Sequence, residues 1–357
     1  MKKKVTAALL FAATGFAYAQ SSVTLYGIVD TGIQYYNNAA AGGSVVGMPS
    51  LTGEVPSRFG IRGVEDLGGG FKTFFVLENG FALNNGALNY GGRLFGRAAN
   101  VGVSSPYGAL TLGRQINMSM YVLFNADVIG PSIHSMASFD SYLPNARSDN
   151  AVGYLGKFNG FTLGGTYSDG RDAAGPAGPS ATNCAGQLAG DPVACRQYTA
   201  MLAYDASQFG LAASYDVMRG GTGASAPLSN SGYTDTRTII DAYVKFSAAK
   251  LGAGWIRRNT SAATHSQSDI YFAGATYYAT PALSFDAQAL RYLQRRQADA
   301  TLLIGRANYL LSKRTTVYSS VGYMLNSSLG NEAVSAGGTV RTGENQLGVM
   351  MGIQQRF

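Results

Sequence analysis

Few side chains of this 357-residue chain have the types and spacing that covalent or acid–base chemistry requires. The two histidines, His134 and His265, lie far apart in stretches that read as loops. The chain has no G-x-S-x-G elbow, no H-E-x-x-H and no P-loop, so nucleophilic, zinc-dependent and nucleotide-phosphate chemistry lack their usual residues. We therefore expect that the protein is not an enzyme and that it has no cofactor and no metal site.

The two cysteines, Cys184 and Cys195, flank a ten-residue segment rich in Gly, Ala and Pro. A structural metal site needs more ligands than this stretch offers, because no histidine lies near it. In an oxidising compartment, two cysteines this close most often form a disulfide. We predict that Cys184 and Cys195 are disulfide-bonded.

The N-terminus has the three parts of a secretory signal peptide. Lysines at positions 2–4 precede an apolar run over 5–16, and Ala17-Tyr18-Ala19 follows as an A-x-A cleavage site. We expect residues 1–19 to be removed, with cleavage between Ala19 and Gln20. The alternative is a membrane anchor, but the apolar run is too short to span a bilayer.

After the expected removal of residues 1–19, arginine carries most of the positive charge of the chain. Residues 20–357 contain 19 arginines and five lysines, and loss of the signal peptide lowers the formal net charge from +7 to +4. A basic balance often indicates nucleic-acid binding, but a secreted chain with scattered arginines does not favour it. The longest polar stretch, about 116–146, carries two acids, Asp127 and Asp140, and neither lysine nor arginine.

The last eleven residues, 347–357, predict the architecture that must position these charges. Leu347, Val349, Met351, Ile353 and Phe357 fall on one face of a period-two pattern, which is typical of a strand. A strand that ends the chain needs a distant partner, and the first strand would close the sheet into a barrel. About ten residues with one apolar face also suffice to cross a bilayer at a tilt.

Turn signals divide the chain into alternating segments. Seven short turns of Gly, Pro, Asn, Asp or Ser alternate with eight longer Gly-rich polar stretches, at about 38–56, 80–92, 116–146, 169–195, 219–236, 259–268, 293–298 and 326–342. Fifteen connections give sixteen strands, with short turns on one rim and long loops on the other. A soluble β-sandwich or jelly roll also alternates, but it does not account for the signal peptide and the asymmetric connections together. One segment, 251–258, has no clean polar face, so the pattern supports its assignment as a strand only weakly.

Five segments are informative together: 22–30 (SVTLYGIVD), 57–71 (SRFGIRGVEDLGGGF), 110–115 (LTLGRQ), 147–154 (RSDNAVGY) and the terminal Arg356-Phe357. They resemble the general porins of Gram-negative bacteria, in the branch common among β-proteobacteria. The resemblance spans essentially the whole chain after residue 19. It implies an all-β fold: a transmembrane, antiparallel, 16-stranded β-barrel over residues 20–357, whose third long loop, about 116–146, folds inward as a constriction loop.

The resemblance also implies a site and partners. The basic residues that it implies for the constriction are Arg58, Arg62, Arg97, Arg114 and Arg147. The acids of the constriction are Asp127 and Asp140 of the long loop, and we expect the arginines to face Asp127 across a narrow gap. Strand parity turns Arg58 and Arg62 toward the lumen but leaves Arg97 and Arg114 on the face of apolar neighbours, unless a bulge intervenes. The expected partners are two further copies in a homotrimer, outer-membrane lipid and lipopolysaccharide, and the outer-membrane assembly machinery, which would read Phe357.

The expected function is passive diffusion of small hydrophilic solutes and ions across the outer membrane of a Gram-negative bacterium. Because the constriction has more arginines than acids, we expect a mild preference for anions. The alternative is a substrate-specific outer-membrane channel, although no dense lysine cluster or aromatic slide is visible. The long loops could also serve in adhesion or as immune targets alongside the pore.

Overall fold

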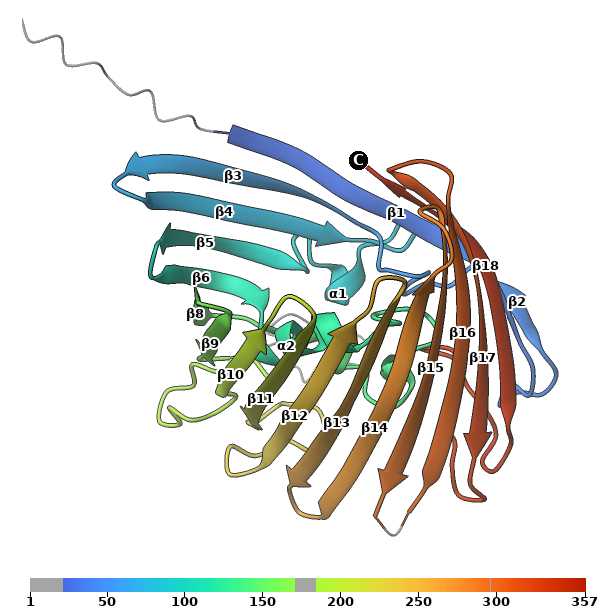
Figure 1. Ribbon diagram of the computed structural model, residues 1–357. Coiled ribbons are helices and arrows are strands. Elements are labelled where there is room, and N and C mark those ends of the chain that lie inside the picture. The colour runs from blue at the N-terminus through green and yellow to red at the C-terminus, as the bar shows by residue number, and fades with distance from the viewer. Residues whose placement is uncertain (1–21, 171–183, 296) are drawn as a thin grey trace, which may run out of the picture.

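The computed structural model describes residues 22–170, 184–295 and 297–357 of the chain. Across these residues, eighteen strands join in one antiparallel sheet that closes on itself (Figure 1). Two of them, β2 and β7, are only three and two residues long. The other sixteen are the long strands that the turn pattern predicts, and the closed barrel is confirmed. The expected signal peptide, residues 1–19, and its cleavage site between Ala19 and Gln20 lie outside the described residues.

The elements follow one another as meandering hairpins. In chain order the strands are β1 (Ser22–Tyr36), β2 (Val45–Gly47), β3 (Arg58–Gly68), β4 (Phe71–Gly80), β5 (Ala98–Ser105), β6 (Gly108–Ile116), β7 (Arg147–Ser148), β8 (Ala151–Phe158), β9 (Phe161–Ser168), β10 (Gln197–Asp205), β11 (Phe209–Arg219), β12 (Thr234–Lys245), β13 (Ala249–Ser261), β14 (His265–Tyr278), β15 (Leu283–Gln294), β16 (Asp299–Leu310), β17 (Thr315–Asn326) and β18 (Gln346–Arg356). The helices are α1 (Asn89–Gly92), α2 (Met118–Ala126) and the 3-10 turns η1 (Met136–Ser138) and η2 (Leu143–Asn145).

The seam of the barrel lies between the two ends of the chain. β1 pairs with β3 through its first half and with β18 through its second half, from Ile28 opposite Arg356 to Tyr36 opposite Gly348. Phe357 extends this ladder, because its backbone N–H and C=O each bond to the backbone of Gly27 at 3.1 Å. The last strand therefore finds its partner in the first strand, as the sequence predicts.

The two faces of the strands meet different surroundings. On β18, Met351 is 72% exposed on the outer face, whereas its neighbours Met350 and Gln354 are buried on the inner face. The same alternation of exposed apolar and buried inward residues recurs around the barrel. In the described part of the chain, no helix is long and apolar enough to span a membrane.

The connections are asymmetric, with one exception to the predicted loop lengths. The stretch 259–268 reads as a long loop, but β13 and β14 continue through it and Ser261 pairs with His265. Polar side chains carry the two strands beyond the apolar band: Arg257 Nε donates to Asp269 Oδ1 at 2.8 Å across this hairpin. Composition alone marks such a polar strand end as a loop.

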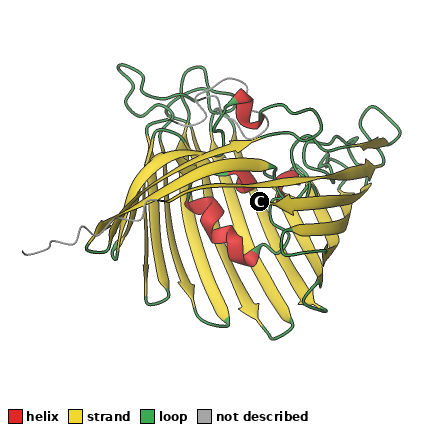
Figure 2. Ribbon diagram, turned by 90° about the horizontal axis from the view of Figure 1, so that it is seen from above, coloured by secondary structure: helices red, strands yellow, loops and turns green. Residues whose placement is uncertain are grey.

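The barrel interior contains a hydrophobic core on one side. The third long connection, residues 117–146 and hereafter loop L3, lies within the ring of strands (Figure 2). Its apolar residues pack against inward residues of the strands from β10 to β17, including Ile239, Ile256 and Leu290. This contact explains the missing polar face of β13, since Gly252 and Ile256 face a helix-bearing loop instead of water.

Candidate functional site: the pore and its constriction loop

Loop L3 begins with the helix α2, whose start is fixed locally. Asn117 adopts an extended conformation and its side-chain oxygen accepts a hydrogen bond from Ser119 N, which caps the helix. The buried face of α2 includes Met118, Val122 and Leu123. A length of nine residues would not hold a helix alone in water, so packing of this face against the barrel wall stabilises it.

The inner wall has space for this helix because a small residue lies where α2 ends. A Cβ atom added to Gly252 of β13 would lie 2.0 Å from the carbonyl oxygen of Ala126, the last residue of α2. Real non-bonded atoms do not approach so closely, so only glycine at position 252 permits the observed position of α2. The path of L3 through the pore is thus set partly by one residue of the wall.

The acids of L3 are used to hold the loop against the wall. Asp140 binds Arg237 of β12 through two hydrogen bonds, and the guanidinium carbon of Arg237 lies 4.4 Å from the ring centroid of Tyr142. Burial acts to raise the pKa of Asp140, but Arg237 and Arg258 outweigh it and hold this pKa below its usual range. Asp140 therefore stays ionised as an anchor within the core.

Asp127 is also turned toward the wall. Its Oδ1 accepts from the backbone N–H groups of Ile129 and Gly130 at 3.2 and 3.1 Å, and from the amide of Gln288 on β15 at 3.0 Å. Burial raises its pKa, although these bonds and Arg306 oppose the shift. The expected arrangement, in which Asp127 faces the arginines across an open gap, is therefore wrong, because Asp127, like Asp140, is bound to partners at the adjacent wall.

One arginine holds two loops at once. Arg306 of β16 donates to the carbonyl oxygens of Ile129 and Val128 at 3.0 and 3.1 Å. It also pairs with Asp286 at 2.8 Å and with Glu54, in the connection between β2 and β3, at 3.3 Å. L3 and the first loop are thus fixed to the same point of the wall, a role that the sequence pattern did not indicate.

The wall opposite L3 carries the accessible positive charge. Arg58 and Arg62 lie on the inward face of β3, as parity predicts, and Arg62 is exposed. Arg58 lies 3.9 Å from Glu78 of β4, and the guanidinium of Arg62 lies over the ring of Tyr26 at 5.5 Å. Both arginines therefore present charge to the lumen, and Glu78 offsets part of it.

Three further arginines, Arg97, Arg114 and Arg147, meet around the ring of Tyr90. Their guanidinium carbons lie 6.0, 5.9 and 5.2 Å from its centroid, and Arg97 Nη1 also donates to the Tyr90 hydroxyl at 2.8 Å. All three side chains are buried. We name these four residues the Tyr90 cluster.

The parity conflict at Arg97 and Arg114 has a local cause at each position. Gly113 has a φ of +107°, which breaks the regular alternation of β6 just before Arg114. Arg97 lies one residue before β5 begins, so the alternation of that strand does not govern it. Its Nε bonds Glu78 at 2.6 Å, and Arg114 pairs with Asp149.

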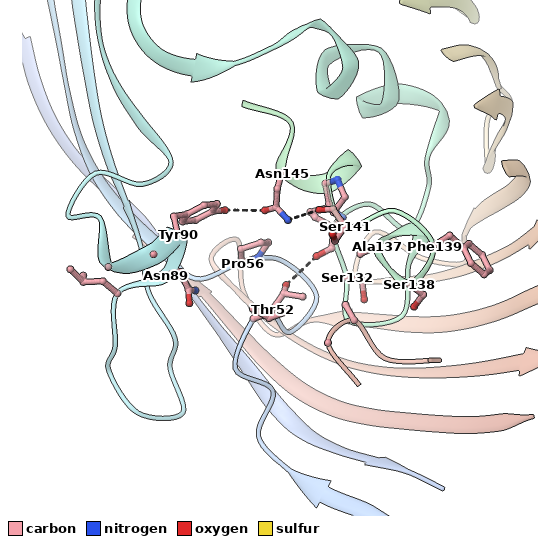
Figure 3. A pocket seen from close by; sticks show the side chains of 18 residues that line it. Thr52, Pro56, Asn89, Tyr90, Ser132, Ala137, Ser138, Phe139, Ser141 and Asn145 are labelled. Atoms are coloured by element: carbon pink, nitrogen blue, oxygen red, sulfur yellow. Dashed lines mark hydrogen bonds between the residues drawn. The ribbon is translucent and has the colours of Figure 1, made fainter. Parts of the chain in front are cut away.

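The cluster separates two cavities. A cavity of about 580 Å³ is bounded by Arg58, Glu78, Arg97 and Arg147 on the wall side and by residues of L3. A second cavity, of about 540 Å³, lies among the loops and is drawn in Figure 3. There Tyr90 points at Asn145 of L3, and its hydroxyl lies 3.2 Å from Asn145 Oδ1 (Figure 3). Tyr90 thus lies between this second cavity, hereafter the loop vestibule, and the three arginines.

Sequence reasoning missed Tyr90 and Glu78. One signal for Tyr90 is the density of glycine around it: a Cβ on Gly80 or Gly96 would lie 2.7 or 2.6 Å from its side chain. Tyr90 itself has a φ of +56°, which L residues other than Asn and Asp rarely adopt. A bulky residue in such a conformation is held by its surroundings.

The two cysteines lie outside this site. Cys184 and Cys195 are joined by a bond of 2.00 Å with Cα atoms 5.2 Å apart, and both are buried in the fourth long loop. Phe357 also lies away from the pore, on the outer face, where it is 47% exposed.

Comparison with known proteins gives a consistent result. The family model described as Gram-negative porin matches residues 5–329. The outer membrane porin protein 32 of Delftia acidovorans is 33% identical, and the alignment covers all of both chains. An outer membrane porin protein of Bordetella pertussis is 36% identical over 60% of this chain and 59% of its own. The solved anion-selective porin from Comamonas acidovorans superposes with a TM-score of 0.78 at 25% identity, covering 95% of this chain and all of that one.

A closed antiparallel barrel with an inward-folded loop and a charged, water-accessible interior is a channel through a membrane. The matched relatives are outer-membrane proteins, and the match to the family model covers most of the chain. This chain belongs to the Gram-negative porin family of outer-membrane channels.

Proposed function

We propose that this porin is a general diffusion channel with a modest preference for anions. The observation that supports it is the division of charge across the lumen. Arg58, Arg62 and the three arginines of the Tyr90 cluster lie on one wall. The acids of L3, in contrast, are bound to partners at the opposite wall. Charged rings at the narrowest part of a pore set its ion preference.

The wall is not fully neutralised by its own acids. Glu78 binds Arg97 and lies near Arg58, and Asp149 pairs with Arg114. Tyr90 lies within this positive charge. Burial acts to raise the pKa of its phenol, yet Arg147, Arg97 and Arg114 together lower it.

The similarity to a solved porin described as anion-selective supports the same reading, since it extends over 95% of this chain. A field that runs from an arginine wall to an apolar loop also orients water and dipolar solutes. Small polar molecules can replace the oriented water in this field, whereas apolar solutes must displace it without compensating interactions. The proposal therefore joins a hydrophilic size filter to a charge preference.

The test is the reversal potential of single channels in a planar bilayer with potassium chloride at different concentrations on the two sides. We expect a potential with the sign of the chloride gradient. A potential with the sign of the potassium gradient would contradict the proposal. Neutral sugars of increasing size, added as non-electrolytes, report the diffusion of uncharged solutes independently.

We further propose the native assembly: a homotrimer in outer-membrane lipid and lipopolysaccharide, inserted by the assembly machinery that recognises Phe357. The support is the family membership together with the exposed aromatic ring at the end of the closing strand. Unboiled protein should migrate as a trimer in a denaturing gel and boiled protein as a monomer. Removal of Phe357 should reduce the assembled fraction in cells, while normal assembly at ordinary expression would exclude its role as a signal.

A further inference from the structure

A third cavity adjoins the one bounded by the arginines, because Tyr121 and Phe124 of α2 and Leu155 of β8 line both. Its volume is about 260 Å³, and it is enclosed by α2 and by the inner wall of β8 to β12. The helix contributes Tyr121, Phe124 and Asn125, and the wall contributes Asp205, Asp241 and Tyr243, among others. Asp205 ends β10 at a short turn, so the cavity faces the rim opposite the long loops.

The cavity contains a buried carboxylate oxygen without a donor. Asp241 is 3% exposed, and its Oδ2 has no hydrogen-bond partner among the described residues. Leaving a buried carboxyl oxygen without a partner is unfavourable, and a cation bound beside it would favour the ionised form. Of the basic side chains that the structure describes, none forms an ion pair with Asp241 or with Asp205.

The second carboxylate is held in place but is not neutralised. Asp205 Oδ1 accepts from the Tyr243 hydroxyl at 2.7 Å and from Asn125 Nδ2 at 3.4 Å. Both donors are neutral groups, so the negative charge of Asp205 remains. The ammonium groups of Lys245 and Lys250 lie over the Tyr243 ring, at 5.0 and 5.3 Å from its centroid.

Two further features favour a positive occupant. The carbonyl end of α2 approaches β13 at Gly252, the register partner of Tyr243, which places the negative end of the helix dipole beside the cavity. The rings of Tyr121, Phe124 and Tyr243 border the same space, and aromatic faces attract cations. The described residues contain no group of three or more His, Cys, Asp or Glu that could hold a metal ion.

We propose that this cavity is a binding site for a small organic ammonium ion. The ammonium group donates to Asp241 Oδ2 and to the carboxylate of Asp205, while its alkyl chain lies against the rings of α2. An ammonium carries three donors and no acceptor, which suits a site of two acceptors and no free donor. Because Asp205 lies at a short turn, the occupant enters from the short-turn rim, and a cation site coexists with an anion-preferring constriction in one pore.

The experiment uses purified full-length protein in a planar bilayer at symmetrical potassium chloride. n-Butylammonium chloride is added to one side and then to the other, and sodium butyrate and 1-butanol serve as the anionic and neutral probes of the same length. We expect n-butylammonium to reduce single-channel current in a saturable manner from one side only. Butyrate and butanol at equal concentration should leave the current unchanged.

Asp241→Asn tests the residue itself, because it preserves shape and removes charge. We expect the half-blocking concentration of n-butylammonium to rise about tenfold or more, the usual loss for a charge-assisted hydrogen bond. Asp299→Asn, at an exposed pair with Arg291 near the opposite rim, is the matched control and should leave it unchanged. The reversal potential of both variants verifies that the pore is intact.

Three outcomes would overturn the proposal. They are equal block by n-butylammonium and 1-butanol, equal block of Asp241→Asn and the unmodified protein, and equal block from both sides. If Asp241→Asn does not assemble, Asp205→Asn together with the three-probe comparison on the unmodified protein still decides the matter. None of these outcomes bears on anion preference, which the reversal potential measures separately.

Discussion

Arg237 of β12 and Asp140 of loop L3 are joined by two hydrogen bonds, of 2.7 Å from Nε to Oδ2 and of 3.2 Å from Nη2 to Oδ1. The two residues stand 97 positions apart in the chain, and each is less than a tenth exposed. This pair ties the return path of the constriction loop to the barrel wall. Asp140, which the sequence assigns to the pore constriction, therefore serves to hold L3 against the barrel wall.

Replacing Asp140 with asparagine should destabilise the protein strongly. Removal of one partner from a buried pair leaves the other charge uncompensated and typically costs about 3–5 kcal/mol; Asp235, at 3.2 Å from Arg237, should keep the loss near the lower end. The unfolding midpoint in detergent measures it. Asp299→Asn, which breaks the exposed pair with Arg291, should cost under about 1 kcal/mol. Equal midpoints for the two variants would refute the anchoring role.

Arg62→Gln should weaken the preference for anions without unfolding the barrel. Arg62 is exposed in the lumen, and at about 7 Å in a watery pore one charge changes the free energy of an ion by about 0.6 kcal/mol. Because this energy has opposite signs for chloride and potassium, the chloride-to-potassium permeability ratio should fall by up to about sevenfold, as read from the reversal potential. Arg341→Gln, in the last long loop, is the charge-matched control and should shift the ratio much less.

The period-two pattern was sufficient to predict the barrel, because each strand has lipid on one face and something different on the other. It also identified the seam, since a terminal strand such as 346–356 has no neighbour later in the chain. The pattern failed where the inner face does not meet water. β13 turns Gly252 and Ile256 toward L3. Its inward residues are therefore apolar or small instead of polar, and the strand shows no amphipathic alternation.

The site was predicted less completely than the fold. The sequence named the arginines of the wall, but the orientation of Asp127 and Asp140 depends on Gln288 and Arg237, which lie 161 and 97 positions away. Parity also depends on an uninterrupted strand, and Gly113 interrupts β6 just before Arg114. Non-local pairs and single positive-φ residues leave little trace in periodicity, so these details required the structure.

Tyr90→Ala should increase both the anion preference and the conductance. The ring of Tyr90 covers Arg97, Arg114 and Arg147 and shields them from the loop vestibule. Its removal exposes their charge to passing ions, and we expect the permeability ratio to rise about twofold by the same Coulomb argument. Tyr107→Ala, at an exposed turn on the opposite rim, is the control. A lower ratio in Tyr90→Ala would show that the ring does not shield the arginines.

Gly252→Ala should displace the constriction helix. The added Cβ would lie 2.0 Å from the carbonyl oxygen of Ala126, and backbone cannot give way as a flexible side chain can. We expect α2 to move toward the lumen, with a lower conductance and a noisier current. Gly305→Ala on β16 is the matched control, because its nearest contact, Val321 Cγ1, would be at an ordinary 3.4 Å. Indistinguishable single-channel currents for the two variants would mean that Gly252 does not position α2.

The stability of the loop should depend on pH through His134. This residue of L3 is fully buried, and its Nδ1 lies 3.1 Å from Ser320 Oγ on β17. Burial lowers the pKa of His134 to about 4, whereas an unfolded histidine titrates near 6.5. Between these values the unfolded chain binds a proton that the folded chain does not, so stability is full above pH 6.5 and falls as the pH drops toward 4, by about 3 kcal/mol.

Other groups titrate over the same interval, so the measurement must be a difference between two proteins. Burial raises the pKa of Glu332 to about 7, and a carboxyl that is more basic when folded acts in the opposite direction, gaining stability as the pH falls from 7. His134→Gln keeps Glu332 and every carboxylate but removes the imidazole. Unfolding midpoints of both proteins at about pH 7 and about pH 4.5 should therefore show a larger acid loss in the unmodified protein. Parallel losses would mean that His134 is already protonated in the folded protein, which would contradict its burial as an uncharged residue.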